Sequence, residues 1–409
     1  MSGFAFEFNL TETLGISIAV LLLGKLLVSK VSILERFCIP APVVGGLVFA
    51  LLNLVGYATG TFSVSMDMTL KNFFMICFFT TVGFGASMSI LKKGGLGVAI
   101  FFAVSSLLCV IQNAVGAGIA VAFGENPLLG LATGSIPMTG GHGTSAAFGP
   151  LLEQAGLSGG LTIAVAAATF GLISGSLLGG PTARRLIERK RLKAQKQAVA
   201  AGSHASQTQL RVEDVVDERE IPLNTGHLST GFFQIAIAVG IGSVISGLIA
   251  KTGIVLPAYV GSMLVAAAMR NIMKDGSRAS IRLKEIQALG DIFLSVFLAQ
   301  ALMDLRLWEL ADLALPMSTI LIVQVVIMFL FATFVTFPFM GRDYDAAVIA
   351  SGHCGFGLGA TPNGVANMTA VTQRYGPSTK AFFILPIVGG LFIDVSNSFI
   401  ITLFLNFLK

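Results

Sequence analysis

Apolar stretches long enough to cross a lipid bilayer recur along the whole chain, and they limit its possible folds more than any other feature of the sequence. A helix needs about 20 apolar residues to span a hydrocarbon core of roughly 30 Å. We predict ten spans, near residues 11–29, 43–58, 70–90, 97–122, 161–180, 231–250, 257–269, 285–302, 316–338 and 380–407. Only 11% of the 409 residues are charged, whereas soluble domains have about 25%. The sequence therefore predicts an all-α polytopic membrane protein.

Two further stretches, 127–152 and 346–372, do not fit plain spans. Both are apolar enough for membrane depth, but glycine, proline, serine and threonine interrupt them. Irregular backbone is tolerated at that depth only where it packs against protein or lines a watery cavity. We predict that each stretch is a glycine-rich re-entrant hairpin.

A polar segment, 184–228, divides the chain into near-equal halves. It begins with a basic run and includes an acidic patch at 213–220, and it lacks the apolar residues needed to bury a core, so we predict a linker that is helical near its start. The halves repeat, because residues 39–50 and 256–267 are identical at six of twelve positions with an offset of 217. The same offset places Gly140 on Gly357 and Thr144 on Thr361. We predict an N-terminal repeat, 1–183, and a C-terminal repeat, 229–409, each with five spans and one hairpin.

Basic residues predict the orientation, because loops rich in Lys and Arg stay in the cytoplasm. With the N-terminus outside, the cytoplasm receives the linker and Lys30, Arg36, Lys92, Lys93, Arg270, Lys274, Arg278, Arg282, Lys284, Arg342, Arg374 and Lys380. The outside keeps Lys71, Lys251, Arg306 and Lys409. This predicts an inner-membrane protein with both termini periplasmic, and it explains the net charge of +5 without nucleic-acid binding. Because five spans are an odd number, the second half is inverted and the two hairpins enter from opposite sides.

The two hairpins carry the residues suited to binding a small ion. Glycines in 134–147 and 351–364 let the backbone turn sharply and expose its N–H and C=O groups. Helix N-termini that begin at such turns favour a carboxylate, because they present free N–H groups and a positive dipole end. Exposed carbonyls joined by the hydroxyls of Thr144 or Thr361 suit a sodium ion. The alternative is that the glycines only allow close helix packing.

Few ionisable or amide side chains fall inside the predicted spans, so each one is informative. Asp394 lies near the middle of the last span, as a partner for an ammonium group or cation, or as a structural carboxylate. Gln112 and Asn113 either brace the first hairpin or contact a ligand. We expect His142 and His353 to pack or hydrogen-bond within the hairpins rather than bind a transition metal.

Four segments resemble those of the bacterial sodium/glutamate symporter family. They are ThrGlyGlyHisGlyThr at 139–144, GlyHisCysGlyPheGlyLeuGlyAlaThrPro at 352–362, IleProAlaProValValGlyGlyLeu at 39–47 and MetGlyArgAspTyrAspAlaAlaValIleAla at 340–350. The resemblance covers the chain apart from the linker, and it implies sodium-coupled uptake of L-glutamate, a site formed by two re-entrant hairpins, and a homodimer. Ser145 occupies a position where the family leads us to expect glycine, and the linker is long.

We therefore predict a secondary active transporter that works by alternating access at a midplane site, with sodium as coupling ion, no cofactor and no enzyme activity. The predicted substrate ligands are Thr139, Gly140, Gly141, Gly143, Thr144, Ser145, Gly359, Thr361, Asn363 and Asp394. The predicted sodium ligands are Gln112, Gly355, Gly357, Ala360, Asn367 and Asn397.

Other functions stay open on the residues alone. They are a sodium-coupled symporter of a dicarboxylate or citrate, an antiporter, a passive channel, and a membrane hydrolase that would use the Ser145–His142 pair.

Overall fold

The computed structural model describes residues 4–36, 39–89, 95–193, 225–251, 258–273, 280–310 and 313–408. Most of the predicted linker, at 194–224, lies outside the described residues, as do Leu256 and Pro257 of the sequence repeat. Five of the basic residues used to predict the orientation also lie outside them, namely Lys92, Lys93, Lys274, Arg278 and Lys409.

Helices coincide with all ten predicted spans. In the first half they are α1 (Leu10–Lys30), α3 (Ala41–Thr59), α4 (Thr69–Gly85), α6 (Gly95–Ala122) and α10 (Gly160–Lys190). In the second half they are α12 (Thr225–Ala250), α13 (Ala258–Ile272), α14 (Leu283–Met303), a helix from Ala314 to Phe339, and one from Thr379 to Leu408. Within the described residues, eight are long and apolar enough to cross a membrane, while α4 and α13 have 17 and 15 residues. The chain is therefore an all-α polytopic membrane protein.

Local signals place several helix ends. Asn9 caps α1, since its side chain accepts from the backbone N–H groups of Thr11 and Glu12, and the Glu12 side chain completes a capping box. Short helix α2 (Ser32–Arg36) follows α1. α10 covers the span predicted near 161–180 and continues to Lys190, which agrees with the prediction that the linker is helical near its start. Arg184 and Glu188 form an ion pair of 3.1 Å one turn apart in this part of the helix. Polar residues continue this helix because charged pairs at that spacing support a solvated helical turn.

The two stretches predicted as hairpins are broken helices. The first contains α7 (Leu128–Ala132), α8 (Ser135–Met138) and α9 (Gly141–Gln154), and the second contains α17 (Tyr344–Gly357) and α18 (Thr361–Tyr375). The first break lies near Gly140, and the second covers Leu358 to Ala360, where the backbone is extended at Ala360. Helical segments on both sides of each break satisfy most backbone hydrogen bonds, which membrane depth requires.

The last two long helices contain π-helical turns. α15 (Ala314–Phe331) continues through η2 (Ala332–Thr336) into α16 (Phe337–Phe339). α19 (Thr379–Ile387) continues through η3 (Val388–Phe392) into α20 (Ile393–Leu408). Such turns widen the helix locally and often occur at functional sites.

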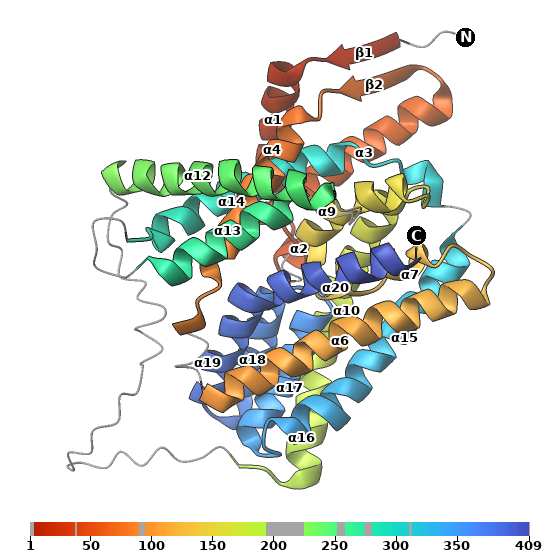
Figure 1. Cartoon of the computed structure of the whole chain (residues 1–409). Coiled ribbons are helices and arrows are strands. Elements are labelled where there is room, and N and C mark those ends of the chain that lie inside the picture. The colour runs from red at the N-terminus through yellow and green to blue at the C-terminus, as the bar shows by residue number, and fades with distance from the viewer. Residues whose placement is uncertain are drawn as a thin grey trace.

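The helices pack into two groups (Figure 1). The scaffold group contains α1, α3, α4, α12, α13 and α14, and the tip group contains α6 to α10 and α15 to α20. Tyr259 of α13 lies between them, because it stacks on Phe79 of α4 at 4.0 Å and meets Phe148 of α9 edge-on at 6.0 Å. The broken helices are thus buried inside the tip group, with one face of α9 against the scaffold group.

A short sheet at one end of the scaffold group was not predicted. β1 (Phe4–Phe8) pairs in parallel with β2 (Phe62–Met66), with Phe4 opposite Phe62 (Figure 1). α1 and α3 lie between the strands in sequence, and a short 3₁₀ turn, η1 (Leu307–Leu310), packs near the end of α3.

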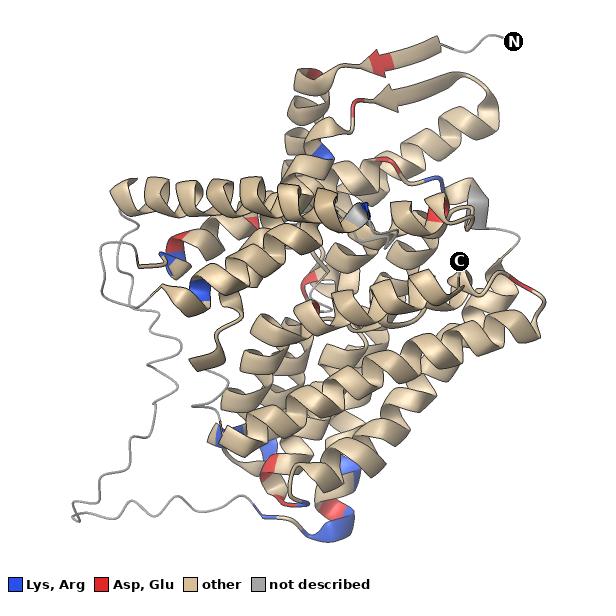
Figure 2. Cartoon of the chain, in the orientation of Figure 1, with Lys and Arg blue, Asp and Glu red and all other residues tan. Residues whose placement is uncertain are grey.

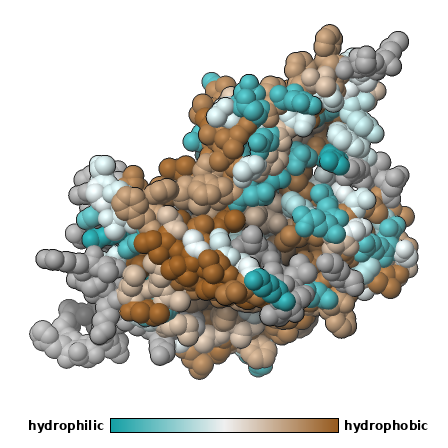
Figure 3. Space-filling model, turned by 45° about the horizontal axis from the view of Figure 1, so that its top comes forward, coloured by the Kyte–Doolittle hydropathy of each residue, from teal (hydrophilic) through white to brown (hydrophobic). Residues whose placement is uncertain are grey.

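Charged residues concentrate at the ends of the helices, and the middle of the molecule is almost free of them (Figure 2). In Figure 3 hydrophobic residues form a broad brown patch across the middle of the view, and polar residues gather above it and to its right. Leu22 of α1, Leu52 of α3 and Val244 of α12 are among the large apolar side chains exposed on the helix surfaces. An apolar exposed belt between charged ends is the surface that a bilayer requires.

Candidate functional site

The two helix breaks meet inside the tip group. Gly141, which begins α9, has a φ of +65°, a left-handed conformation that favours glycine. A Cβ atom added to Gly141 would lie 2.9 Å from the carbonyl oxygen of Gly359 in the second break. Two segments more than 200 residues apart in sequence therefore touch through their backbones.

Gln112 of α6 connects the two breaks. Its Nε2 donates to the carbonyl oxygen of Gly357 at 2.7 Å, and its Oε1 accepts from Oγ1 of Thr139 at 2.8 Å. The side chain is fully buried, and Nε2 of Gln324 in α15 donates to its backbone carbonyl at 2.8 Å. A buried amide with both ends satisfied fixes the positions of its partners. Gln112 was predicted as a sodium ligand. It thus joins Thr139, a predicted substrate ligand, to Gly357, another predicted sodium ligand.

A second group of amides holds the first break against α6 and α20. Oδ1 of Asn397 accepts from Oγ of Ser135 at 2.7 Å, and its Nδ2 donates to the Ser135 carbonyl at 3.1 Å. Oδ1 of Asn113 accepts from the backbone N–H of Ser135 at 2.8 Å. The predicted sodium residue Asn397 is therefore adjacent to the start of α8.

The second break packs against α10. Nδ2 of Asn363 donates to the Leu172 carbonyl at 3.0 Å, and Nδ2 of Asn367 donates to the Gly175 carbonyl at 2.9 Å. A Cβ atom on Gly171 would lie 2.1 Å from the Leu358 carbonyl oxygen, so this contact requires glycine. Both predicted asparagines thus use their amide nitrogens to hold α18 on α10.

The remaining predicted residues of the first break differ in what they contact. Thr144 is buried, and its hydroxyl lies 2.5 Å from the position that a Cβ on Gly140 would take. The Ser145 hydroxyl, which has one proton to donate, lies 2.8 Å from the Gly141 carbonyl oxygen and 3.1 Å from that of Ala164, so it connects α9 to α10. Gly143 faces the scaffold group, because a Cβ there would lie 3.6 Å from side-chain atoms of Phe78 in α4 and Leu294 in α14.

The remaining predicted residues of the second break lie along the turn that joins α17 to α18. The backbone N–H of Ala360 donates to the Gly355 carbonyl at 3.2 Å. A Cβ on Gly355 would lie 2.6 Å from the Asn363 carbonyl oxygen, so the turn closes tightly on itself. Oγ1 of Thr361 lies 2.6 Å from the position of a Cβ on Gly389 in η3. This turn therefore packs against both α10 and η3.

Asp394, the predicted substrate carboxylate, is the second residue of α20 and is half-buried. In the part of the chain that the structure describes, its carboxylate accepts no hydrogen bond, which leaves its oxygens available to a cationic ligand. Asn397 lies one turn further along α20. Its hydrogen bond with Ser135 connects this part of α20 to the first break.

Several buried polar atoms near the breaks have no protein partner among the described residues. They are Oδ1 of Asn363, Oε1 of Gln324, Oγ of Ser351 and Nδ2 of Asn113. Buried polar atoms in native proteins are almost always satisfied, so unpaired ones indicate a place for water, an ion or a ligand. Three of the four are oxygen atoms that can coordinate a hard cation.

Sequence reasoning missed Ser135 and Gln324 as members of this polar group. Gln324 was detectable as a glutamine inside an apolar span, since such residues usually face the protein interior. Ser135 gave no comparable signal.

The histidines are hydrogen-bonded, as expected, but to neighbouring helices. Nε2 of His142 lies 3.0 Å from Oγ1 of Thr169, and Nδ1 of His353 lies 2.8 Å from Oγ1 of Thr336. Among the described residues no group of three His, Cys, Asp or Glu side chains could hold a metal ion.

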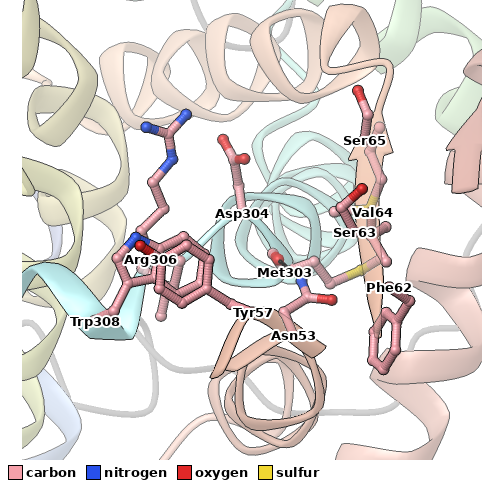
Figure 4. A pocket seen from close by; sticks show the side chains of 12 residues that line it. Asn53, Tyr57, Phe62, Ser63, Val64, Ser65, Met303, Asp304, Arg306 and Trp308 are labelled. Atoms are coloured by element: carbon pink, nitrogen blue, oxygen red, sulfur yellow. Dashed lines mark hydrogen bonds between the residues drawn. The ribbon is translucent and has the colours of Figure 1, made fainter. Parts of the chain in front are cut away.

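A separate cavity of about 360 Å³ opens beside the short sheet (Figure 4). The stacked rings of Tyr57 and Trp308, 4.1 Å apart, form one wall, and Asp304 and Arg306 point into it from the end of α14. Asp304 is paired with Lys71 at 3.4 Å. None of the predicted ligands lines this cavity, so it is distinct from the breaks.

Comparison with known proteins gives consistent matches over nearly the whole chain. The family model described as sodium/glutamate symporter matches residues 6–377. The sodium/glutamate symporter of Escherichia coli K12 is 41% identical over 412 aligned positions, covering 98% of this chain and 98% of that protein. The sodium/glutamate symporter of Haemophilus influenzae is 41% identical over 400 positions, covering 96% of each.

Proposed function

The chain belongs to the sodium/glutamate symporter family, and we propose that it is a secondary active transporter that couples L-glutamate uptake to sodium entry. The relatives are named as symporters, not as enzymes. We propose that cargo and ion bind between the two helix breaks, near the bilayer midplane.

The observation that carries this proposal is the contact between the breaks at Gly141 and Gly359, together with the bridge that Gln112 forms from Thr139 to Gly357. Broken helices whose ends meet inside an apolar bundle present backbone N–H and C=O groups where no water competes for them. N–H groups suit the carboxylates of glutamate, and carbonyls suit the sodium ion. The half-buried Asp394 is available to the ammonium group of the substrate or to a cation.

Sodium is preferred to a proton because amides, hydroxyls and carbonyls dominate this region. A proton relay requires several buried acids, and Asp394 is the carboxylate that the sequence places at mid-span. The same donors would also accept another small carboxylate. A sodium-coupled dicarboxylate or citrate symporter is therefore the alternative.

Two inverted repeats, 1–183 and 229–409, joined by the linker 184–228, account for the order of the helices. Under the offset of 217, α4 corresponds to α14 and α6 corresponds to α15. Lys71 at the start of α4 pairs with Asp304 after the end of α14, so these equivalent helices run antiparallel. In α6 and α15, Gln112 contacts Gln324, and a Cβ on Gly357 would lie 2.8 Å from both Leu108 and Met328. Antiparallel equivalent helices are what an inverted repeat produces, and they support re-entrant hairpins that enter from opposite sides.

We place the basic end of the tip group in the cytoplasm of a bacterial cell, with the linker there and both termini periplasmic. Lysine and arginine residues gather at the lower end of the molecule in Figure 2. Arg184 lies in the last two turns of α10, Arg342 follows α16, and Arg374 and Lys380 lie at the end of α18 and the start of α19. Tyr375, next to Arg374, donates to Glu188 of α10 at 2.9 Å, so these helix ends are adjacent. Positive charge at one end supports a cytoplasmic position in the inner membrane.

Alternating access would follow from movement of the tip group against the scaffold group. A cavity of about 170 Å³ already separates them where Thr81 and Asp291 face Gly390 of η3. We assign a homodimer surface to the exposed apolar face of α3, which carries Leu47, Leu51 and Leu52, whereas most apolar residues of α13 are buried. Both statements rest on the family resemblance and on the packing described above.

The test is uptake of radiolabelled L-glutamate into proteoliposomes with an inward sodium gradient, against potassium-only and proton-gradient controls. Accumulation that requires sodium, and that Thr144→Ala or Thr361→Ala protein loses while still inserting, would support the proposal. Uptake of glutamate that follows its own gradient alone would instead identify a passive channel, and sodium-driven uptake of a dicarboxylate or citrate in place of glutamate would favour the alternative.

A further inference from the structure

A strongly basic cavity lies where α10 meets η2 and α16. Its volume is about 440 Å³, and no acidic side chain lines it. We call it the basic pocket, and it is lined by Arg185, Leu186, Arg189, Lys190, Thr333, Phe334, Phe337, Pro338 and Arg342. None of these residues belongs to the helix breaks or to the predicted ligands.

The cations of the basic pocket have no carboxylate partner within the described part of the chain. The nearby acids are used elsewhere, because Glu188 pairs with Arg184 and accepts from Tyr375, while Asp343 caps α17 and lies 3.6 Å from Lys380. All four of these basic side chains are exposed, and together they attract an anion that lies between them. The charge pattern therefore indicates an anionic occupant.

Two basic side chains are held in place over aromatic rings. The guanidinium of Arg185 lies 5.5 Å from the ring centre of Phe329, and the ammonium of Lys190 lies 5.3 Å from that of Phe337. Cation–π contacts of this kind orient a cation without neutralising it. The positive groups thus stay available to an incoming anion.

Two further features of the cavity wall indicate a ligand. Oγ1 of Thr333 is buried without a hydrogen-bond partner among the described residues. Arg342 has a φ of +59°, a left-handed conformation that is unfavourable for arginine. Residues held in such conformations concentrate at ligand-binding positions.

The position of the basic pocket indicates the kind of anion. It lies at the ends of two membrane-length apolar helices, Gly160–Lys190 and Ala314–Phe339. Phe334 and Phe339 are 68% and 62% exposed there, on a surface suited to acyl chains. Basic pockets between transmembrane helices bind the headgroups of anionic lipids, and Arg forms paired hydrogen bonds with phosphate.

We infer that the basic pocket binds the phosphate headgroup of an anionic phospholipid, with Arg185, Arg189 and Arg342 on the phosphate and Thr333 donating its hydroxyl. The acyl chains would lie along Phe334 and Phe339. This inference goes beyond the transport reaction and does not depend on which cargo is carried.

The experiment is native mass spectrometry of the purified full-length protein titrated with phosphatidylglycerol, with phosphatidylcholine of the same acyl chains, and with soluble glycerol phosphate. We expect retained phosphatidylglycerol under conditions that strip phosphatidylcholine, and little retention of glycerol phosphate. Glycerol phosphate retained as well as the lipid would show a free-phosphate site and overturn the lipid assignment.

A matched pair of triple variants separates the pocket from general positive charge. Arg185→Gln/Arg189→Gln/Arg342→Gln should weaken phosphatidylglycerol retention at least tenfold. Arg184→Gln/Arg191→Gln/Lys193→Gln removes the same charge from residues that do not line the pocket and should leave retention unchanged. Equal losses in the two triples would overturn the inference.

Two more variants complete the test. Thr333→Val keeps every charge and should weaken phosphatidylglycerol retention several-fold. It therefore remains informative if the first triple variant folds poorly. Unchanged retention in this variant would count against the hydrogen bond from Thr333 to the phosphate. The acidic patch at 213–220 is the competing occupant in the chain itself. Neutralising that patch should leave lipid retention unchanged. If the wild-type protein retained no phosphatidylglycerol until the patch was neutralised, the basic pocket would be assigned to the linker in the natural chain.

Discussion

The carbonyl oxygen of Gly359 lies 2.9 Å from the position that a side chain on Gly141 would first occupy. The contact leaves no room for a methyl group, and the φ of +65° at Gly141 adds a second reason for glycine. The junction between the two helix breaks therefore depends on the absence of a side chain at one position.

Gly141→Ala should lower the initial rate of sodium-driven uptake about tenfold or more. A left-handed alanine costs roughly 1–2 kcal/mol, about tenfold in an equilibrium constant, and displacement of Gly359 adds to this. The control is Gly118→Ala in α6, where an added Cβ meets nothing within 4 Å. Uptake by Gly141→Ala equal to that of the Gly118→Ala control would show that the close contact does not matter for transport.

Gln112→Leu should abolish sodium-dependent uptake and lower the melting temperature in detergent. The change leaves the Gly357 carbonyl and the Thr139 hydroxyl unpaired, and each buried unpaired group costs about 1–3 kcal/mol. Uptake as a function of sodium concentration and a melting curve measure the two effects.

The matched control for Gln112→Leu is Gln300→Leu. Gln300 is equally buried but lies in α14 of the scaffold group, where its Nε2 contacts Oγ of Ser17 at 3.4 Å. We expect this variant to lower stability while the sodium concentration for half-maximal uptake stays near the wild-type value. Loss of sodium-dependent uptake in both variants would mean that removing any buried amide has this effect.

Asp394→Asn should lose concentrative uptake, because the variant keeps the shape of the side chain but removes the charge that faces a cation. Concentrative uptake under a sodium gradient measures coupling. Exchange of internal for external glutamate in the presence of sodium needs an inserted protein but no sodium gradient, so the two measurements distinguish lost coupling from lost insertion. Asp291→Asn is the comparison, since Asp291 is exposed and lines the cavity between the two groups. An Asp394→Asn protein that accumulates glutamate normally would remove Asp394 from the site.

Ser145→Ala should retain uptake and reduce stability by about 0.5–1.5 kcal/mol, because it removes the one hydrogen bond that the hydroxyl donates to the carbonyls of Gly141 and Ala164. Ser145→Gly, the residue that the family resemblance leads us to expect, should lose about 0.5–1 kcal/mol more through helix entropy. Melting temperatures of the purified variants measure this order. A large loss of uptake in Ser145→Ala would instead indicate a direct contact with cargo.

A cross-link between Gly85→Cys and Leu391→Cys should block uptake while leaving equilibrium binding of glutamate measurable. A Cβ on Gly85 would lie 3.0 Å from the Leu391 side chain, so the two cysteines would face each other across the two groups. Reduction should restore transport. Full uptake by fully cross-linked protein would exclude relative movement of the groups at this point.

The sequence predicts the membrane helices well because a long apolar run has few alternatives to a helix in a bilayer. The breaks near Gly140 and Gly357 were also predictable, since glycines and prolines interrupt otherwise apolar stretches. The sheet of β1 and β2 was not, because a parallel pair of five-residue strands depends on how α1 and α3 return the chain.

The candidate site was predictable as a set of residue types but not as a set of contacts. Gln112 and Asn397 stood out as amides inside apolar spans. Their partners Thr139 and Ser135 could not be assigned, because a hydrogen bond between helices depends on tertiary packing that local patterns do not encode. Residues predicted as sodium or substrate ligands therefore keep that status as proposals, apart from Ser145, whose hydroxyl proton is used by protein carbonyls.

The bridge between the two breaks consists of Gln112, Thr139 and Gly357, and none of these groups carries a net charge at any physiological pH. Moving one elementary charge across a membrane potential of 100 mV involves about 2.3 kcal/mol, but displacing a neutral bridge through the same field involves no such work. A current measured during a transport cycle would then report the charges of bound ions, cargo and Asp394, and the bridge itself would move at the same rate in a polarised and a depolarised membrane.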